Sequence, residues 1–205
     1  MKWLRSSFPS HNKQRLQIKR STMRLKRLIP EQMSEGQKLA YDAIAGGKRS
    51  HVARKSPLIG PDGALEGPFN AMLLAPKVGM ALQGLGSAIR YESGLTSRVR
   101  ELSILMVAAR WNCVFEQQAH EPLALDLGVT ELELEAIRSG GSPEAQSESE
   151  RLSFDAIARL LSSGDLNDEI YQKCKEELGE EQIFELTTLV GYYSTLALQL
   201  RVFRV

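Results

Sequence analysis

The stretch from Arg98 to Gly128 constrains the fold more than any other part of the chain. Its first half is apolar on nearly every side of a helix, at Leu102, Ile104, Leu105, Met106, Val107, Ala108 and Ala109. Because a helix on the surface needs a polar face, this pattern predicts a helix that is buried all round. Cys113, Glu116 and His120 follow directly, and their i, i+3 and i+7 spacing places them on one helical face. The stretch therefore predicts a core helix that ends at a cluster of chemically active side chains.

Composition limits the number of domains, the kinds of partner and the location that the chain can have. The chain has 205 residues, of which 42% are hydrophobic and 25% are charged, and this suits one compact domain with a tail. A formal net charge of +1 gives no electrostatic reason to expect nucleic acid or a membrane as a partner. No apolar run approaches the ~20 residues that cross a bilayer. Two cysteines far apart, Cys113 and Cys174, form no disulfide framework and favour a reducing, cytoplasmic location.

The N-terminal segment differs from the rest in its charge. Residues 1–30 are rich in Lys and Arg and contain no Asp or Glu. We expect them to form a basic, disordered extension and residues 31–205 to form the helical domain. Residues 1–22 also have the composition of a mitochondrial transit segment, so a mitochondrial location is the alternative. Met23 reads like a natural start, which leaves open whether residues 1–22 belong to the native protein.

Helical periodicity, capping boxes and glycine or proline stops predict an all-α protein that folds as a compact helical bundle. Capping boxes are expected at Ser34, Thr130 and Ser147. The predicted helices span residues 35–46, 69–75, 76–91, 97–110, 113–127, 130–139 and 180–202, and a further helix begins at 147. A loop is predicted at 48–68. Residues 147–160 resemble residues 34–47, which suggests at most an old internal duplication with insertions.

Glu116 and His120 form the better candidate for acid–base chemistry. At i and i+4 the carboxylate can bind the imidazole, select its tautomer and raise its basicity, which suits a general acid or base. The same spacing equally suits a satisfied ion pair that joins two helices. Two such side chains without a spaced third His or Cys do not predict a metal site.

Glu101 can join this pair only if the chain reverses. In one straight helix, Glu101 and Cys113 would lie about 18 Å apart at ~1.5 Å per residue. Trp111, Asn112 and Cys113 have weaker helix propensity than the preceding run, so we predict a break there and a second helix that folds back.

These residues resemble the carboxymuconolactone decarboxylase family, which includes the alkylhydroperoxidase D-type proteins. The resemblance runs from about Met23 to Phe203 and includes GPFNAMLLAP, IRYESGL, RELSILMVAARW, FEQQAHEPLALDLGV and FELTTLVGYYSTLALQL. The hydroperoxidase branch reads Glu, eleven residues, Cys, two residues, Cys, three residues, His. Glu101, Cys113 and His120 fall on that spacing, but Glu116 stands in the place of the second cysteine.

The resemblance implies two activities. A family decarboxylase or lyase needs no cofactor, and it would use His120 as the acid with Arg110 or Arg90 holding the carboxylate of a small carboxylated or lactone substrate. A thiol-dependent peroxide reductase with an antioxidant role would use Cys113. Glu116 cannot resolve a sulfenic acid and should raise the pKa of the Cys113 thiol, so that thiol is either a packing group or a single-cysteine nucleophile. The resemblance also implies a homo-oligomer, and a non-catalytic oligomeric member is the third reading.

Overall fold

The computed structural model describes residues 24–47 and 57–205, and over these residues the chain is an all-α bundle, as predicted. No strand forms within the described residues, where one isolated antiparallel bridge joins Ile59 and Leu65. The elements in chain order are η1 (Pro30–Gln32), α1 (Glu35–Ala45), α2 (Pro68–Met72), α3 (Pro76–Tyr91), α4 (Ser97–Trp111), α5 (Val114–Asp126), α6 (Glu131–Arg138), α7 (Glu148–Ser163), α8 (Asp168–Glu177) and α9 (Gly179–Phe203).

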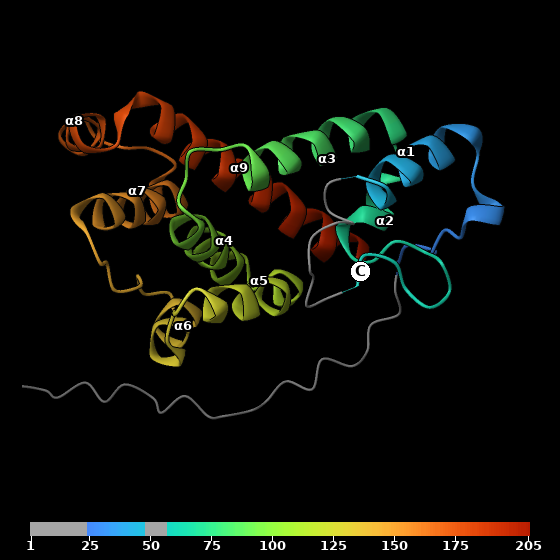
Figure 1. Cartoon of the computed structure of the whole chain (residues 1–205), viewed down its shortest axis with the longest axis horizontal. Helices are drawn as coiled ribbons and strands as arrows, with labels where there is room; N and C mark the ends of the chain where they lie inside the picture. Colours follow the sequence, from blue (N-terminus) through green and yellow to red (C-terminus); the bar gives the residue numbers. More distant parts are fainter. Residues whose placement is uncertain (1–23, 48–56) are drawn as a thin grey trace, which may run out of the picture.

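Helix α4 is the core helix that the apolar run predicts. It packs against α5, α6, α7 and α9 (Figure 1). Every residue from Glu101 to Ala108 is buried, so the helix has no solvent-facing side over two turns. Burial of aliphatic side chains on all sides stabilises α4 through the hydrophobic effect, at roughly 1.5–3 kcal/mol for each fully buried large side chain.

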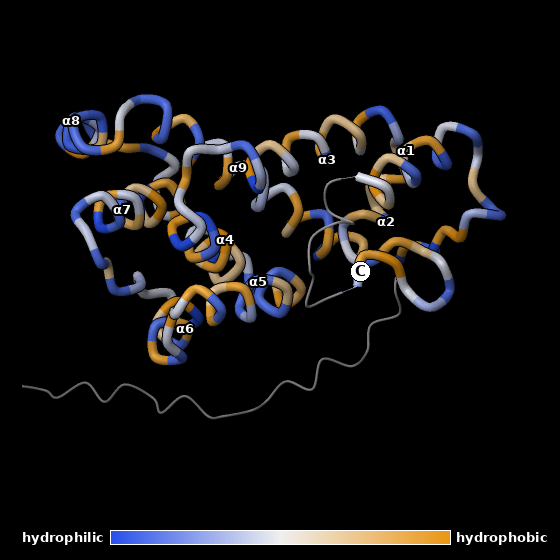
Figure 2. Tube along the Cα trace, in the orientation of Figure 1, coloured by the Kyte–Doolittle hydropathy of each residue, from blue (hydrophilic) through white to orange (hydrophobic). Residues whose placement is uncertain are grey.

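Helix α9 packs against helices at both ends of the molecule. It contacts α2 and α3 at one end and α7 and α8 at the other, with α4 between (Figure 1). The helix α8 is not among the predicted elements. It is mostly hydrophilic (Figure 2) and buries only Ile170 and Cys174, which leaves too few apolar positions for a periodic signal. None of the helices among the described residues combines the length and apolarity that crossing a bilayer requires.

The chain reverses between α4 and α5, as predicted. Asn112 ends α4 in the left-handed conformation, with φ 51° and ψ 47°. Asparagine tolerates this conformation better than most residues that carry a side chain. Helix α5 then runs back along α4, against which it packs. The reversal brings the middle of α5 next to the first turns of α4, where Glu101 lies.

Two of the three predicted capping boxes form, at Ser34 and Thr130. At Ser147 only half of the box is present, because the hydroxyl accepts from the Glu150 backbone N–H. The Glu150 carboxylate instead accepts from Gln146 N at 2.9 Å and pairs with Arg98 of α4. The buried guanidinium is a stronger partner for a carboxylate than a backbone amide.

The N-terminal residues up to Met23, and the part of the predicted 48–68 loop between 48 and 56, lie outside the described residues. Residues 24–30 are packed on the bundle. Leu25 is buried, and Arg27 donates to both Asp62 and Glu66 of the loop before α2. The described part of that loop, 57–67, is non-helical, as predicted, and the packed chain includes residues from Arg24 onward.

Close helix packing explains Gly79 but not Gly84. A Cβ at Gly79 would clash with the backbone carbonyl of Met72 in α2, so α2 and α3 can approach only because this side chain is absent. A Cβ at Gly84 would meet nothing within 4 Å, so packing does not require a glycine there. Leu39 of α1 and Val78 of α3 leave apolar side chains exposed on this part of the fold.

Candidate active site

Glu101, Glu116 and His120 come together in the interface between α4 and α5. The Nδ1 atom of His120 lies 2.6 Å from Oε2 of Glu101, and its Nε2 atom lies 3.3 Å from Oε2 of Glu116. All three residues are buried, with exposed fractions of 3%, 4% and 6% for Glu101, Glu116 and His120. The imidazole is therefore held at both nitrogens by carboxylates, away from bulk water.

Two carboxylates favour the protonated form of this histidine. Burial by itself lowers the pKa of His120, but the hydrogen bonds to Glu101 and Glu116 outweigh it and raise the pKa above its ordinary value. Burial likewise acts to raise the pKa of Glu101, but the hydrogen bond to His120 and the nearby arginines hold it below its ordinary range. In its protonated form the imidazolium donates one N–H to each carboxylate.

Two arginines complete the charge balance around Glu101. Nη2 of Arg90 lies 3.5 Å from Oε1 of Glu101, and Nε of Arg100 lies at the same distance. Nη1 of Arg90 is 3.3 Å from Nδ1 of His120. Since both groups are donors when His120 is protonated, that contact is not a hydrogen bond in this state, and Glu101 attracts both cations. Of the two predicted carboxylate holders, Arg90 is the one at the site.

Arg110 lies elsewhere, which corrects its predicted place at the site. It follows Glu101 by nine residues, about half a turn out of phase at ~100° per residue, so it leaves the opposite side of α4. Its Nε donates to the backbone carbonyl of Leu161 in α7 at 3.2 Å. Sequence spacing alone does not reveal this, because which side of a fully buried helix faces the site depends on its packing.

Tyr193 is a site residue that the sequence interpretation misses. Its ring meets the His120 ring edge-on, with 5.6 Å between centroids and an interplanar angle of 89°. Tyr193 is buried, and burial raises the pKa of its phenol. In the sequence it reads as one of many apolar positions of α9, and only the adjacent aromatic pair with Tyr192 sets it apart.

One atom of the cluster has no bonding partner among the described residues. Oε1 of Glu116 is buried and accepts no hydrogen bond, while its Oε2 faces His120. A buried carboxylate oxygen without a donor is unusual, because it forfeits its solvation. This oxygen is the natural acceptor for a donor group of a substrate or for a water molecule.

Cys113 is next to the cluster, and its surroundings favour the protonated thiol over the thiolate. It is the N-cap of α5, is 7% exposed, and packs with Ala108 of α4 and Leu200 of α9. Burial raises the pKa of its thiol, and the Glu116 carboxylate adds to this, while the backbone N–H groups of Glu116 and Phe115 act in the opposite direction. The net shift is upward, so little thiolate forms at neutral pH. Cys174 belongs to a separate core cluster and is no resolving partner.

We expect Cys113 to resist iodoacetamide in the folded protein at pH 7, because both burial and the raised pKa suppress its thiolate. Alkylation should become appreciable only above about pH 9. Mass spectrometry of the alkylated Cys113 peptide measures this, with urea-unfolded protein as the positive control. The Glu116→Gln variant should react faster, since it removes the carboxylate that disfavours the thiolate. Rapid alkylation of the wild type at pH 7 would contradict this picture.

The described residues contain no group of three or more His, Cys, Asp or Glu side chains arranged to hold a metal ion. Glu101, Glu116 and His120 bond to one another instead, with both imidazole nitrogens engaged. By itself the cluster can hold a proton on Nε2 of His120. Glu101 fixes the imidazole ring through Nδ1, and Glu116 makes the longer contact with Nε2.

Comparison with known proteins bears on the family and the fold of this chain. The model of the carboxymuconolactone decarboxylase family matches residues 76–159, the segment from α3 into α7 that contains Arg90, Glu101, Cys113, Glu116 and His120. No curated protein matches the chain significantly.

A solved structure of a protein of unknown function from Agrobacterium tumefaciens, described as a putative antioxidant defence protein AhpD, has a similar fold. Its TM-score is 0.55 at 20% sequence identity, and the match covers 68% of this chain and 96% of that one. At this identity the likeness concerns the fold alone. Residues 76–159 of this chain match the model of the carboxymuconolactone decarboxylase family, in agreement with the residues that carry the resemblance in its sequence.

Proposed function

We propose that the protein is a cofactor-free acid–base lyase that decarboxylates a small carboxylated or lactone substrate. The observation that carries the proposal is the buried imidazolium of His120, held between Glu101 at 2.6 Å and Glu116 at 3.3 Å. A buried proton donor whose pKa is raised suits a reaction in which carbon must be protonated near neutral pH.

The two nitrogens of His120 have different tasks in this proposal. The short bond from Nδ1 to Glu101 fixes the ring and its tautomer, as the carboxylate partner of a catalytic histidine does. The longer contact from Nε2 to Glu116 leaves that proton easier to transfer. Nε2–H is therefore the acid, and the unpartnered Oε1 of Glu116 is placed to accept a hydrogen bond from the substrate.

The reaction then balances without a metal or an organic cofactor. The substrate carboxylate, attracted by Arg90, leaves as CO2, and its bonding electron pair stays on the α-carbon. Conjugation with a lactone carbonyl spreads this charge, and Nε2–H of His120 delivers the proton that forms the new C–H bond. The positive charge that stabilises the carbanion comes from Arg90 and the imidazolium, both on the chain itself.

A thiol-dependent peroxide reductase is the alternative, with Cys113 as the nucleophile. The backbone N–H groups of Phe115 and Glu116 that point at its sulfur support it, and so does the description of the Agrobacterium tumefaciens structure as an antioxidant defence protein. The raised pKa of Cys113 and the glutamate in place of a resolving cysteine favour the lyase. A non-catalytic, oligomeric role is the third candidate.

The test is a paired assay on wild type and Cys113→Ala, with Cys174→Ala as the matched control. CO2 release is followed with small lactones that carry a ring carboxylate, and peroxide consumption is followed with hydrogen peroxide and dithiothreitol. We expect CO2 release by all three proteins within about twofold of one another, and peroxide consumption no faster than without enzyme. Peroxide turnover that Cys113→Ala abolishes would overturn the lyase, and no turnover in either assay would favour the non-catalytic role.

A further inference from the structure

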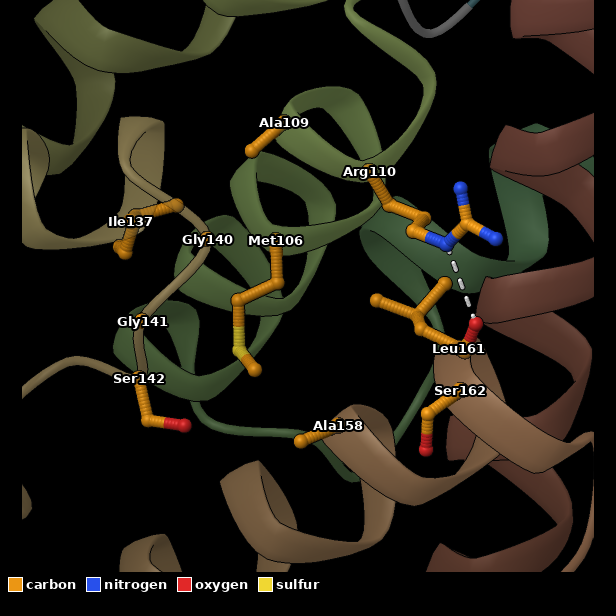
Figure 3. Close-up of a pocket in the computed structure, with 10 residues that line it drawn as sticks. All are labelled: Met106, Ala109, Arg110, Ile137, Gly140, Gly141, Ser142, Ala158, Leu161 and Ser162. Atoms are coloured by element: carbon orange, nitrogen blue, oxygen red, sulfur yellow. Dashed lines mark hydrogen bonds between the residues drawn. The ribbon is translucent and has the colours of Figure 1, made fainter. Parts of the chain in front are cut away.

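A cavity lies on the far side of α4 from His120. It has a volume of about 200 Å³ and is enclosed by α4, α6, the connection that follows α6, and α7 (Figure 3). Its lining residues are Met106, Ala109, Arg110, Ile137, Gly140, Gly141, Ser142, Ala158, Leu161 and Ser162. None of the residues of the His120 cluster is among them, so the cavity is separate from the proposed reaction.

The inner wall of this cavity is apolar. Met106 and Ile137 are 5% and 2% exposed, and the Met106 side chain extends into the space between the two helices and the connection (Figure 3). Gly140, whose φ is 84°, lets the chain bend over the opening without adding a side chain there. An engineered apolar cavity of about 150 Å³ holds benzene, so this one has room for one ring and a substituent.

The rim of the cavity has one charge, and it is positive. Arg110 is the sole charged side chain among the ten lining residues, and no lining residue is Asp or Glu. Its Nε donates to the Leu161 carbonyl (dashed in Figure 3), and among the described residues its two terminal nitrogens bond to no protein atom. A guanidinium anchored at Nε with both terminal N–H2 groups available matches a carboxylate in geometry and charge.

Hydroxyl groups add to this polarity at the rim. Ser142 directs its hydroxyl toward the cavity from the connection after α6 (Figure 3). Ser162 lies beside Leu161 on α7 and donates to the Arg159 carbonyl. An apolar pocket with a few convergent polar groups is the usual form of a small-molecule site.

We infer that this cavity binds a small monocarboxylate with a compact apolar body, such as an arylacetate. The apolar body lies between Met106 and Ile137, and the carboxylate lies at the rim against the guanidinium of Arg110. A neutral ligand of the same shape would leave that guanidinium without a charged partner, and a phosphate monoester would bring a second negative charge that the single cation of the lining does not balance. Charge complementarity at the rim and apolar volume inside together select the carboxylate.

Calorimetric titration of the full chain with phenylacetate tests the inference, with 2-phenylethanol as the neutral probe of the same shape. We expect phenylacetate to bind at least tenfold more tightly than the alcohol, and Arg110→Gln to remove that difference. Ala158→Leu, which fills the cavity with the charge intact, should abolish binding. Arg159→Gln removes the same charge one residue from the lining and should change the affinity less than about twofold.

Amide NMR shifts identify where the probe sits, and thermal unfolding of each variant confirms that it is folded. Shifts at Ile137 and Gly140 support the cavity. The inference is overturned by shifts confined to the His120 cluster, by equal affinity for the acid and the alcohol, by unchanged binding in Arg110→Gln, or by no heat up to about 20 mM phenylacetate.

Discussion

Replacing Glu101 with glutamine is expected to lower the free energy of unfolding by roughly 3–5 kcal/mol. The carboxylate is 3% exposed and lies 2.6 Å from Nδ1 of His120 and 3.5 Å from Nη2 of Arg90. The amide keeps the shape but removes the negative charge, so a buried imidazolium and the partly buried guanidinium of Arg90 lose their shared counter-ion. Urea unfolding monitored by circular dichroism measures the loss.

Glu148→Gln is the matched control for this substitution. Glu148 pairs with Arg151 on the surface, and both side chains are more than half exposed. Because exposed ion pairs contribute little, the control should lose far less stability than Glu101→Gln. A similar, small loss in both variants would mean that the contact between Glu101 and His120 is weak in solution.

The same contact makes the stability depend on pH, with a definite sign. The pKa of Glu101 is lowered in the folded protein, so its contribution is present above its ordinary value of 4.5 and is lost as the pH falls through the folded value. The pKa of His120 is raised, so its contribution is present below its ordinary value of 6.5 and is lost as the pH rises through the folded value. Stability should therefore fall toward both ends of this range, and less steeply in Glu101→Gln.

On the substrate that the lactone assay identifies, His120→Gln is expected to lower kcat by about 10²–10⁴-fold with a small change in KM, because general acid catalysis is lost while the binding groups stay. Arg90→Gln should chiefly raise KM, since Arg90 holds the substrate carboxylate. Steady-state kinetics separates the two effects. Equal kcat in His120→Gln and the wild type would remove His120 from the reaction.

The pH–rate profile of the wild type gives an independent measurement, which matters because His120→Gln leaves Glu101 and Glu116 facing each other and is destabilised. The acid works only as the imidazolium, so kcat should fall as the pH rises through the raised pKa of His120. Glu116→Gln removes one of the two carboxylates that raise this pKa, and it should move the fall in activity to lower pH. A profile that Glu116→Gln leaves unchanged would show that another group is the acid.

Much of the fold was predictable because its signals are local. The apolar run of α4 has no polar face, the capping hydroxyls of Ser34 and Thr130 mark helix starts, and the weak propensity around Asn112 marks the reversal. Helix α8 was not predicted, since a short polar helix with two buried residues has almost no periodicity. The spacing of Glu116 and His120 places both on one face of α5 whatever surrounds them.

Local signals do not say which side of a buried helix faces which neighbour. Arg90 and Arg110 are equally good carboxylate holders in the sequence, but the packing of α3 brings Arg90 to His120, whereas the packing of α4 turns Arg110 toward α7. Tyr193 reaches the imidazole because α9 packs across α4, a contact between residues far apart in the chain. Burial of Cys113 likewise depends on α9, which contributes Leu200.

The sequence by itself thus determined the helical class, the core helix, the reversal after it and the Glu–His pair, because each depends on neighbours within one or two turns. The tertiary structure decided the partners of that pair, the protonation of His120, the raised pKa of Cys113 and the separate cavity beside Arg110. Burial and the distances between charges set these properties, and both arise only when helices remote in sequence pack together.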